Sequence, residues 1–395
     1  TSTPTPPSTP TGGPCRFCAA ELTETFVDLG KSPLCETYLT PEQLLEGEMF
    51  YPLHVFVCSE CFLVQLQEFV TRDEIFREYA YFSSYSAAWL DHCKRYVDEM
   101  VDVMALDADS LVVELASNDG YLLQYFVERG VEVLGVEPAL NVAAVATERG
   151  IPTRTDFFGR ECAEQLAEEG VSADLVLGNN VLAQVPDLND FVGGIPTILA
   201  PHGRVTIEFP HLMRQVEENQ FDQVYHEHFS YFSLVAAERI VAHHGLRIFD
   251  VEELWTHGGS IRIHAGHDET APAETDRLRA LRRHELEIGT ETLAYYRDFA
   301  ARVEQLRRDI LTFLIDAKNA GARVAGYGAP GKGNTLHNYC RIRSHLIEFT
   351  VDRNPYKHDR FTPGTHIPIY DPARLDEDPP DYVYILPWNL TDEIT

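Results

Sequence analysis

The stretch that most constrains the fold runs from residue 111 to residue 120 and reads LVVELASNDG. An apolar run of this length between turn signals is typical of a buried strand in a parallel sheet. The turn that follows is rich in small and polar residues. Its backbone amides and the start of the next helix can therefore face a ligand at the carboxyl edge of the sheet. These residues predict an α/β fold with a ligand site beside the turn.

The second strand of this unit ends in an acidic residue. The apolar run 131–136 leads into Glu137 and Pro138, and a carboxylate at this strand tip can accept hydrogen bonds from ribose hydroxyls. The first turn lacks the G-x-G-x-x-G pattern of dinucleotide-binding folds. Its E-x-A-x-N-D-G pattern resembles the cofactor loop of class I S-adenosylmethionine methyltransferases, with another nucleotide-binding turn or a purely structural turn as alternatives. The predicted cofactor residues in the loop are Glu114, Ala116, Ser117, Asn118 and Gly120.

Two later strand ends point to the same edge of the sheet. Asp156 and Phe157 follow a third strand, where the carboxylate would accept a hydrogen bond from an adenine amino group and the ring would pack on the base. Asn179 and Asn180 follow a fourth strand at 174–178. Their order along one doubly wound sheet places all of them in the predicted cofactor site.

Two C-x-x-C pairs near the N-terminus predict a metal site. Four thiolates at this spacing bind one Zn²⁺ in a closed, structural, tetrahedral site. A redox-active pair is the alternative for one C-x-x-C, but two pairs in one small module favour zinc. The predicted ligands are Cys15, Cys18, Cys58 and Cys61.

Titratable groups are concentrated in segment 220–233, QFDQVYHEHFSYFS, where Tyr225, His226, Glu227 and His228 are consecutive. On a strand they would alternate between two faces, whereas in a loop or at a helix start they could converge. The H-E-H run does not have the spacing of known metal motifs. We therefore interpret these four residues as candidates for general acid–base catalysis, with a polar patch capping the sheet as the alternative.

Three further segments are candidates for contact with a substrate. The aromatic run at 79–85 would line a pocket or, by default, pack in the core. The turn WTHGGS at 255–260 contains two glycines that permit close approach of a ligand to the backbone. The glycine-rich turn GYGAPGKGNT at 326–335 could hold a diphosphate with its amides and its lysine. The candidate substrate residues in these segments are Tyr79, Tyr81, Phe82, Ser83, His257, Gly259 and Lys332.

The net charge of −30 argues against non-specific binding to nucleic acid or to anionic membranes. The sequence contains no apolar run long enough to span a bilayer, and its first residues lack the features of a signal peptide. Eight cysteines, four of them in the two pairs, fit a reducing compartment. We therefore expect a cytoplasmic protein that binds neither nucleic acid nor membrane.

The chain divides by composition and periodicity into five parts. Because its structured parts could enclose a site within one chain, a monomer is compatible with the sequence. The predicted divisions are a disordered Pro/Thr-rich tail at 1–14, a zinc-binding module at 15–72, a methyltransferase domain at 73–268, two linking helices at 269–322 and a smaller Rossmann-like domain at 323–395.

The two C-x-x-C pairs, the E-x-A-x-N-D-G loop, the YHEHFSYFS block, HGGS and G-Y-G-A-x-x-K-G-N-T occur in this order. Their combination resembles the zinc-containing sugar C-methyltransferases of deoxysugar pathways. The resemblance implies S-adenosylmethionine as methyl donor, structural zinc, and a nucleotide-linked keto-sugar held with the help of the C-terminal domain. It also implies His228 as general base, next to Glu227 and with Tyr225 two positions before that glutamate.

Carbon methylation on this scheme begins with removal of a proton α to a ketone. Histidine has a suitable pKa for this step, Glu227 would orient His228, and Tyr225 or His226 would donate to the enolate oxygen. An O- or N-methyltransferase on the same scaffold and a non-catalytic nucleotide-binding protein are the alternatives.

One position departs from the pattern of the family. In the segment NVLAQVP this chain has Gln184 where relatives carry histidine. A neutral amide cannot change its charge near pH 7. We therefore expect Gln184 to contact the substrate in a different way, with an effect on enolate stabilisation, sugar position or substrate choice.

Overall fold

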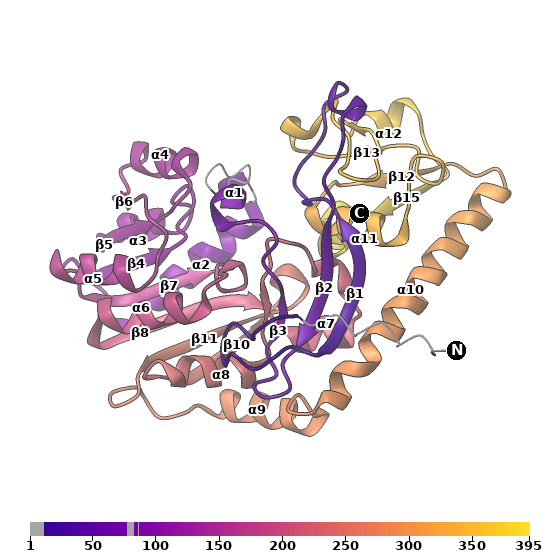
Figure 1. The fold of residues 1–395 in the computed structure, drawn as a ribbon. Coiled ribbons are helices and arrows are strands. Elements are labelled where there is room, and N and C mark those ends of the chain that lie inside the picture. The colour runs from indigo at the N-terminus through magenta and orange to yellow at the C-terminus, as the bar shows by residue number, and fades with distance from the viewer. Residues whose placement is uncertain (1–11, 77–82, 86) are drawn as a thin grey trace, which may run out of the picture.

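The computed structural model describes residues 12–76, 83–85 and 87–395 (Figure 1). In the described parts of the chain the named strands form three sheets. One sheet has seven strands, and the other two have four strands each. Three of the candidate substrate residues, Tyr79, Tyr81 and Phe82, lie outside the described residues. The mixed α/β architecture predicted from the sequence is confirmed.

The central sheet has the strand order β10-β11-β8-β7-β4-β5-β6. The five strands from β8 to β6 are parallel, and β11 runs antiparallel to β8 and to β10. Parallel strands covered on both faces need apolar side chains in both directions, which the sequence of β4 supplies. The bounds are β4(Leu111–Leu115), β5(Glu132–Val136), β6(Thr153–Arg154), β7(Ala173–Asn179), β8(Leu199–Pro210), β10(Leu246–Leu254) and β11(Ser260–His267).

Helices cover both faces of this sheet. Helices α2(Ala87–Met104) and α3(Leu123–Glu128) share a core with Val112, Leu175 and Leu177. On the opposite face, α5(Arg160–Glu168), α6(Leu188–Ile198) and α8(Leu234–His243) pack with Val113 and Val176. Alternation of strand side chains accounts for this division. The remaining helices of this region are α1(Arg72–Phe76), α4(Leu140–Glu148) and α7(Leu212–Glu217), and the 3₁₀ turns are η2(Ser83–Tyr85), η3(Leu182–Gln184), η4(Phe221–Gln223) and η5(Thr256–Gly258).

The sheet of the zinc module is completed by a strand from the central domain. Strands β1(Glu24–Ser32), β2(Tyr51–Val57) and β3(Val64–Leu66) are antiparallel neighbours, with η1(Gln43–Leu45) between β1 and β2. The fourth strand, β9(Ser230–Tyr231), pairs with β3 and comes directly after the Tyr225–Phe229 segment. The candidate catalytic segment is therefore attached to the zinc module through a backbone ladder.

The two helices after the central sheet are α9(Asp276–Ile288) and α10(Leu293–Asn319). Figure 1 shows α10 running along one side of the molecule toward the C-terminal domain. Its 27 residues correspond to a length of about 40 Å. The helix also packs on the zinc module, because the rings of Phe26 and Phe299 stack 4.5 Å apart.

The C-terminal sheet is parallel, with the order β14-β13-β12-β15, and α11 follows β12. Strand β13 is short and begins only at Thr350. Leu346 and Ile347 contribute buried side chains to the core in the turn that precedes it. The bounds are β12(Val324–Tyr327), α11(Gly331–Cys340), β13(Thr350–Val351), η6(Pro355–Lys357), β14(Ile369–Tyr370), α12(Arg374–Glu377), β15(Tyr382–Ile385), η7(Trp388–Leu390) and α13(Thr391–Ile394).

Of the helices that the structure describes, none combines the length and the apolar character needed to cross a bilayer.

Candidate active site and zinc centre

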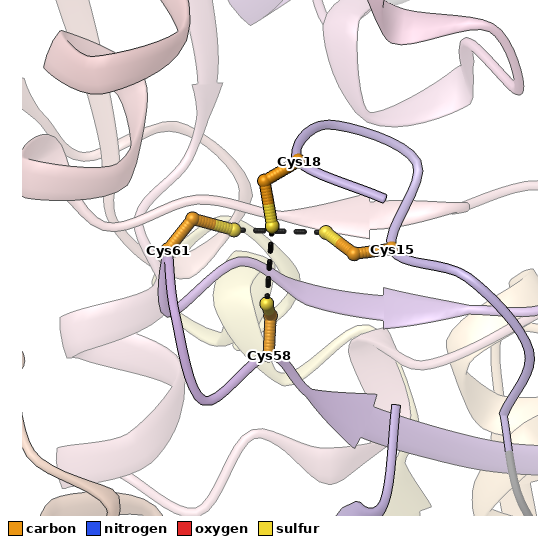
Figure 2. Close-up of side chains that lie close together, drawn as sticks. All are labelled: Cys15, Cys18, Cys58 and Cys61. Atoms are coloured by element: carbon orange, nitrogen blue, oxygen red, sulfur yellow. Dashed lines mark hydrogen bonds between the residues drawn. The ribbon is translucent and has the colours of Figure 1, made fainter. Parts of the chain in front are cut away.

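The four cysteines of the two C-x-x-C pairs meet at one point. Their sulfur atoms all lie within 4.8 Å of one another, with Cys15 and Cys61 3.6 Å apart and Cys18 and Cys58 3.5 Å apart (Figure 2). A tetrahedral Zn²⁺ with sulfur ligands at about 2.3 Å requires sulfur–sulfur distances of about 3.8 Å. The geometry therefore fits one closed Cys₄ zinc site.

Neighbouring groups support the sulfur atoms. The Gln65 side-chain amide donates to Cys15 Sγ at 3.1 Å, and the Glu60 backbone amide is 3.4 Å from Cys58 Sγ. Such donors stabilise thiolate charge and fix the direction of the ligands. Since all four ligands are cysteines, no position is left for water, and the role of the zinc is structural.

We expect the Cys58→Ser variant to lose its zinc. Its free energy of unfolding should fall by about 3–5 kcal/mol, because metal binding at such a site contributes folding energy. Metal analysis should give about one equivalent for the unsubstituted protein. Cys162→Ser is the matched control, because that thiol is buried outside the cluster. Full zinc content in a Cys15/Cys58 double variant would contradict the assignment.

The predicted cofactor loop has a strained backbone that the sequence accommodates. Ala116 and Asn118 have φ values of 58° and 49°, and Gly120 has a φ of 76°. A side chain at Gly120 would also bring a Cβ atom within 2.3 Å of Ile151. Glycine is therefore required at this position, and the loop folds back over the ends of β4 and β5.

Glu137 is held by this loop. Its carboxylate accepts hydrogen bonds from the backbone amides of Asn118 at 2.9 Å and Ala139 at 2.8 Å. Burial raises the pKa of Glu137 to about 6, while the two amides act in the opposite direction. A carboxylate has about four acceptor positions, so two remain for ribose hydroxyls.

Unpaired polar atoms surround the same edge of the sheet. Among the described residues no hydrogen-bond partner is found for Ser117 Oγ, for either side-chain atom of Asn179, or for Asn180 Oδ1, although all four atoms are buried. Burial raises the pKa of Glu114 well above its usual range, with the Tyr121 hydroxyl opposing this shift. Buried polar groups are normally paired. These residues therefore fit a polar ligand of the size and chemistry of S-adenosylmethionine.

Other predicted cofactor residues have protein partners. The Asp156 carboxylate forms an ion pair with Arg154 at 2.7 Å, and the Arg72 guanidinium lies over the Phe157 ring at 4.4 Å from its centre. Their roles toward an adenine remain predictions. Pro138 lies between Glu137 and the start of α4.

Replacement of Glu137 by alanine should weaken S-adenosylmethionine binding by about 1–3 kcal/mol, or about 5- to 150-fold in the dissociation constant. Calorimetry with Glu132→Ala provides a control, because Glu132 is an exposed carboxylate at the start of β5, the strand that leads into Glu137. Unchanged affinity in the Glu137 variant would remove its ribose-binding role.

His228 is fixed in one tautomer. Its Nδ1 lies 3.1 Å from the carbonyl oxygen of Gln223; since a carbonyl only accepts, the proton is on Nδ1 and the lone pair is on Nε2. Among the described residues no hydrogen-bond partner is found for Nε2, and this atom is not fully buried. The Tyr225 ring lies 4.0 Å from the imidazole, centre to centre. Burial lowers the pKa of His228 to about 3, so the imidazole is neutral at pH 7.

Two neighbours of His228 face away from it. The Glu227 carboxylate accepts a hydrogen bond from the Cys35 thiol at 3.7 Å, and its pKa is raised to about 8 by burial and by the charge of Glu36. We predicted that Glu227 orients His228, but the Gln223 carbonyl does so. His226 Nε2 is 3.1 Å from the Pro52 carbonyl oxygen in β2, which turns this ring toward the zinc module and away from the enolate role that we predicted.

The C-terminal domain forms the opposite wall of this site. Lys332 Nζ donates to Asn389 Oδ1 at 2.7 Å and lies 4.8 Å from the centre of the Trp388 ring. The indole of Trp388 donates to Asp222 at 2.6 Å. Burial lowers the pKa of Lys332 to about 8, with Asp222 raising it. The ammonium in turn lowers the pKa of His228, and the Trp388–Asp222 hydrogen bond joins this wall to the segment that carries His228.

The HGG turn at 257–259 contacts both the segment that carries His228 and the C-terminal domain. The Gln223 side chain donates to the carbonyl oxygen of His257, and a Cβ atom at Gly258 would lie 2.3 Å from the Trp388 ring. Gly258 therefore permits the approach of Trp388, whereas the space beside Gly259 is filled by Arg214. Burial, with Lys332 adding to it, lowers the pKa of His257 to about 4. His257 is thus a neutral ring beside the lysine.

Two other candidate substrate residues, Ser83 and Gln184, lie at the edges of the candidate site. The Ser83 backbone amide donates to Asn118 Oδ1 at 3.0 Å, which places η2 over the cofactor loop. Gln184 ends η3, and the neighbouring Ala183 carbonyl accepts a hydrogen bond from the Phe229 amide at 2.7 Å.

Four residues of the site were not predicted from the sequence: Asp222, Gln223, Trp388 and Asn389. Asp222 and Gln223 belong to the same QFDQVYHEH block, and the other two follow the last strand of a parallel sheet, where ligand sites are expected. A buried network was not predicted either: Glu208 accepts hydrogen bonds from Arg262 at 2.6 Å, from Thr256 at 2.8 Å and from His92 at 2.9 Å. The hydrogen bond to Glu208 holds Thr256, the residue that precedes His257, in place.

Three family models match consecutive parts of the chain: a zinc binding domain at residues 15–76, a methyltransferase domain at 87–251 and a C-methyltransferase C-terminal domain at 255–395. The C-methyltransferase NovU of Streptomyces niveus is 36% identical over 384 residues, which cover 96% of this chain and 90% of that protein.

Solved structures match about half of the chain, more distantly. Magnesium protoporphyrin IX methyltransferase from Synechocystis PCC 6803 with bound S-adenosylhomocysteine is 15% identical over 45% of this chain and 81% of its own, with a TM-score of 0.35. The PH0226 protein from Pyrococcus horikoshii OT3 is 13% identical over 51% of this chain and 100% of its own, with a TM-score of 0.37. The family assignment rests on the family models and on the 36% identical relative. The chain belongs to the zinc-containing, S-adenosylmethionine-dependent sugar C-methyltransferases.

Proposed function

We propose that this enzyme methylates carbon in a nucleotide-linked keto-deoxysugar through an enolate, with His228 as general base. The observation that supports the proposal best is the state of that imidazole. Its Nδ1 proton is engaged by the Gln223 carbonyl, which leaves the Nε2 lone pair available to accept a proton. A neutral imidazole of fixed tautomer can accept a proton from the carbon next to a ketone.

The residues around His228 divide the remaining work. The cofactor loop and Glu137 would hold S-adenosylmethionine, which supplies an electrophilic methyl group when bound. His228 Nε2 would take the proton, and Tyr225, whose ring is tilted against the same imidazole, would donate to the enolate oxygen. Because Trp388 and Gly258 close the space between the two domains, bulk water is restricted at the carbanion. Holding the methyl donor and the enolate close together in the correct orientation accounts for much of the remaining rate acceleration.

Lys332 would bind an anionic oxygen of the substrate. We expected this ammonium to contact the diphosphate. The ammonium would also suit an enolate oxygen, because its neighbour Trp388 is hydrogen-bonded to Asp222 in the segment that carries His228. A diphosphate contact would appear mainly in KM, and an enolate contact in kcat. Gln184, on η3 next to the catalytic segment, would contact the sugar with an uncharged amide.

The proposal is tested by proton exchange and by the structure of the product. Incubated in D₂O with a dTDP-linked 4-keto-6-deoxysugar and S-adenosylhomocysteine, the enzyme should incorporate deuterium at the carbon next to the ketone. With S-adenosylmethionine, NMR of the product should show a new carbon–carbon bond. A methyl group on oxygen or nitrogen, without exchange, would instead establish the alternative chemistry on this scaffold.

A further inference from the structure

Arg16, which lies inside the first C-x-x-C pair, connects the zinc centre to the catalytic segment. Its backbone amide donates to Gln65 Oε1 at 2.9 Å, and the amide nitrogen of the same glutamine side chain donates to the Cys15 thiolate. Gln65 thus bonds to the zinc ligand and to Arg16 at once. The position of the arginine backbone is set by the metal site.

The guanidinium of Arg16 reaches out of the zinc module. Nη1 donates to the Pro186 carbonyl oxygen at 2.6 Å, and Nη2 donates to the Leu66 carbonyl oxygen. The same group lies over the Phe229 ring, 5.5 Å from its centre. One planar cation therefore contacts three segments that are remote in sequence.

Two of these segments adjoin a residue of the candidate site. Phe229 follows His228, and Pro186 is two residues after Gln184. The Phe229 amide donates to the Ala183 carbonyl at 2.7 Å, and its carbonyl accepts from the Leu66 amide at 3.0 Å. The guanidinium therefore joins the segment that carries His228 and the Gln184 turn at the point where they already contact each other.

We propose that Arg16 is a positioning residue, through which the zinc centre holds His228 and the Gln184 turn in register with each other. This inference rests on the proposed role of His228 as base. The zinc knuckle thus acts on the chemistry as well as on the folding of its own module. A planar fork with two donors can bond two carbonyl oxygens at once and pack on a ring, which a lysine cannot reproduce.

The test compares Arg16→Lys and Arg16→Gln with Arg239→Lys. Arg239, on α8, also contacts the zinc module, through the Phe62 ring at 5.5 Å, but it does not bond the Pro186 or Leu66 carbonyls. Four quantities are measured in each variant: zinc content, S-adenosylmethionine affinity by calorimetry, kcat and KM for the sugar nucleotide, and hydrogen exchange of the peptides that contain the Leu66 and Phe229 amides.

Both Arg16 variants should keep one zinc and full cofactor affinity. Their kcat should fall by about 10- to 100-fold, the size of effect that a misplacement of about 1 Å produces, and the Leu66 and Phe229 amides should exchange faster. Arg239→Lys should leave all four quantities unchanged. Unchanged kcat and exchange in the Arg16 variants would overturn the inference, and so would loss of zinc or cofactor affinity in both variants, because Arg16 would then only stabilise the fold.

The exchange measurement separates this inference from the proposed function. If His228 is not the base, His228→Ala stays active while the amide protection is still sensitive to Arg16. In that case the proposed function fails, and the inferred effect of Arg16 on catalysis fails with it, although the contact itself is verified. If His228→Ala and the Arg16 variants all lose kcat, and only the Arg16 variants lose amide protection, the proposed function and the positioning role are both supported.

Discussion

Replacement of His228 by alanine should lower the rate of methyl transfer by about 10²- to 10⁴-fold, the contribution of a positioned general base. Deuterium exchange next to the ketone should be lost together with methylation, because both need the same proton to be removed. Affinity for S-adenosylmethionine should not change, since the imidazole is bonded to Gln223 and not to the cofactor loop. Stopped assays that follow exchange and methylation in parallel would measure this.

His226→Ala is the matched control for this variant. Its ring is two positions away in the same turn, but Nε2 is turned toward the Pro52 carbonyl. This variant should retain most of its activity and lose some stability. Full activity of His228→Ala would refute the assignment of the base, and retained exchange without methylation would transfer the proton-removing role to another residue.

The pH dependence of the same group has a definite sign. Burial lowers the pKa of His228 from 6.5 to about 3. The neutral, active form is therefore retained as the pH falls through 6.5. Between those two values the unfolded chain binds a proton that the native imidazole does not. Stability is therefore full above about pH 6.5 and decreases as the pH falls toward 3. His228→Asn should reduce this acid sensitivity, as measured by denaturant unfolding at pH 7 and pH 5.

Replacement of Lys332 by methionine should lower kcat/KM for the sugar nucleotide by about 10²- to 10³-fold, as expected when a buried charge aimed at a developing anion is removed. Affinity for S-adenosylmethionine should not change, because Lys332 lies on the C-terminal wall with Asn389 and Trp388. Burial lowers its pKa to about 8, so activity that depends on the ammonium should decline as the pH rises through 8.

Two controls interpret this result. Lys318→Met removes a half-exposed cation on α10 and should have little effect, which would exclude a general consequence of net charge. Lys332→Arg keeps the charge but changes its shape. A loss confined to KM would assign the lysine to the diphosphate, and a loss in kcat would assign it to the enolate. Equal losses of substrate and cofactor affinity would indicate a damaged fold and contradict both roles.

The sequence by itself determined those features that depend on local pattern. The LVVEL run and the turn after it predicted a parallel strand and a ligand loop, because burial on both faces and a left-handed turn leave few choices of residue. The cysteine spacing predicted the metal site, because four thiolates in two short knuckles can reach a single ion. The QFDQVYHEH block identified the candidate catalytic segment in the same way.

Only the tertiary structure decided which side chains of that block face one another. Spacing along the chain made Glu227 the natural partner of His228, yet the turn directs the carboxylate to Cys35 and gives Nδ1 to the Gln223 carbonyl. The course of that turn depends on β9 pairing with β3, a contact between residues far apart in sequence. Such pairing is set by the burial of whole surfaces, which local residue pattern does not encode.

The same reason applies to Lys332 and Arg16. The glycine-rich turn predicted a cation near a ligand, but the place of Lys332 in the site follows from the packing of Trp388 on Gly258 between two domains. Arg16 had no distinguishing pattern, since any residue fits between two zinc ligands. Its role arises from where the folded chain places the Pro186 and Leu66 carbonyls. Long-range contacts of this kind exist only once the separate elements have buried their apolar faces against each other, so the sequence fixes the chemical groups and the packing fixes their partners.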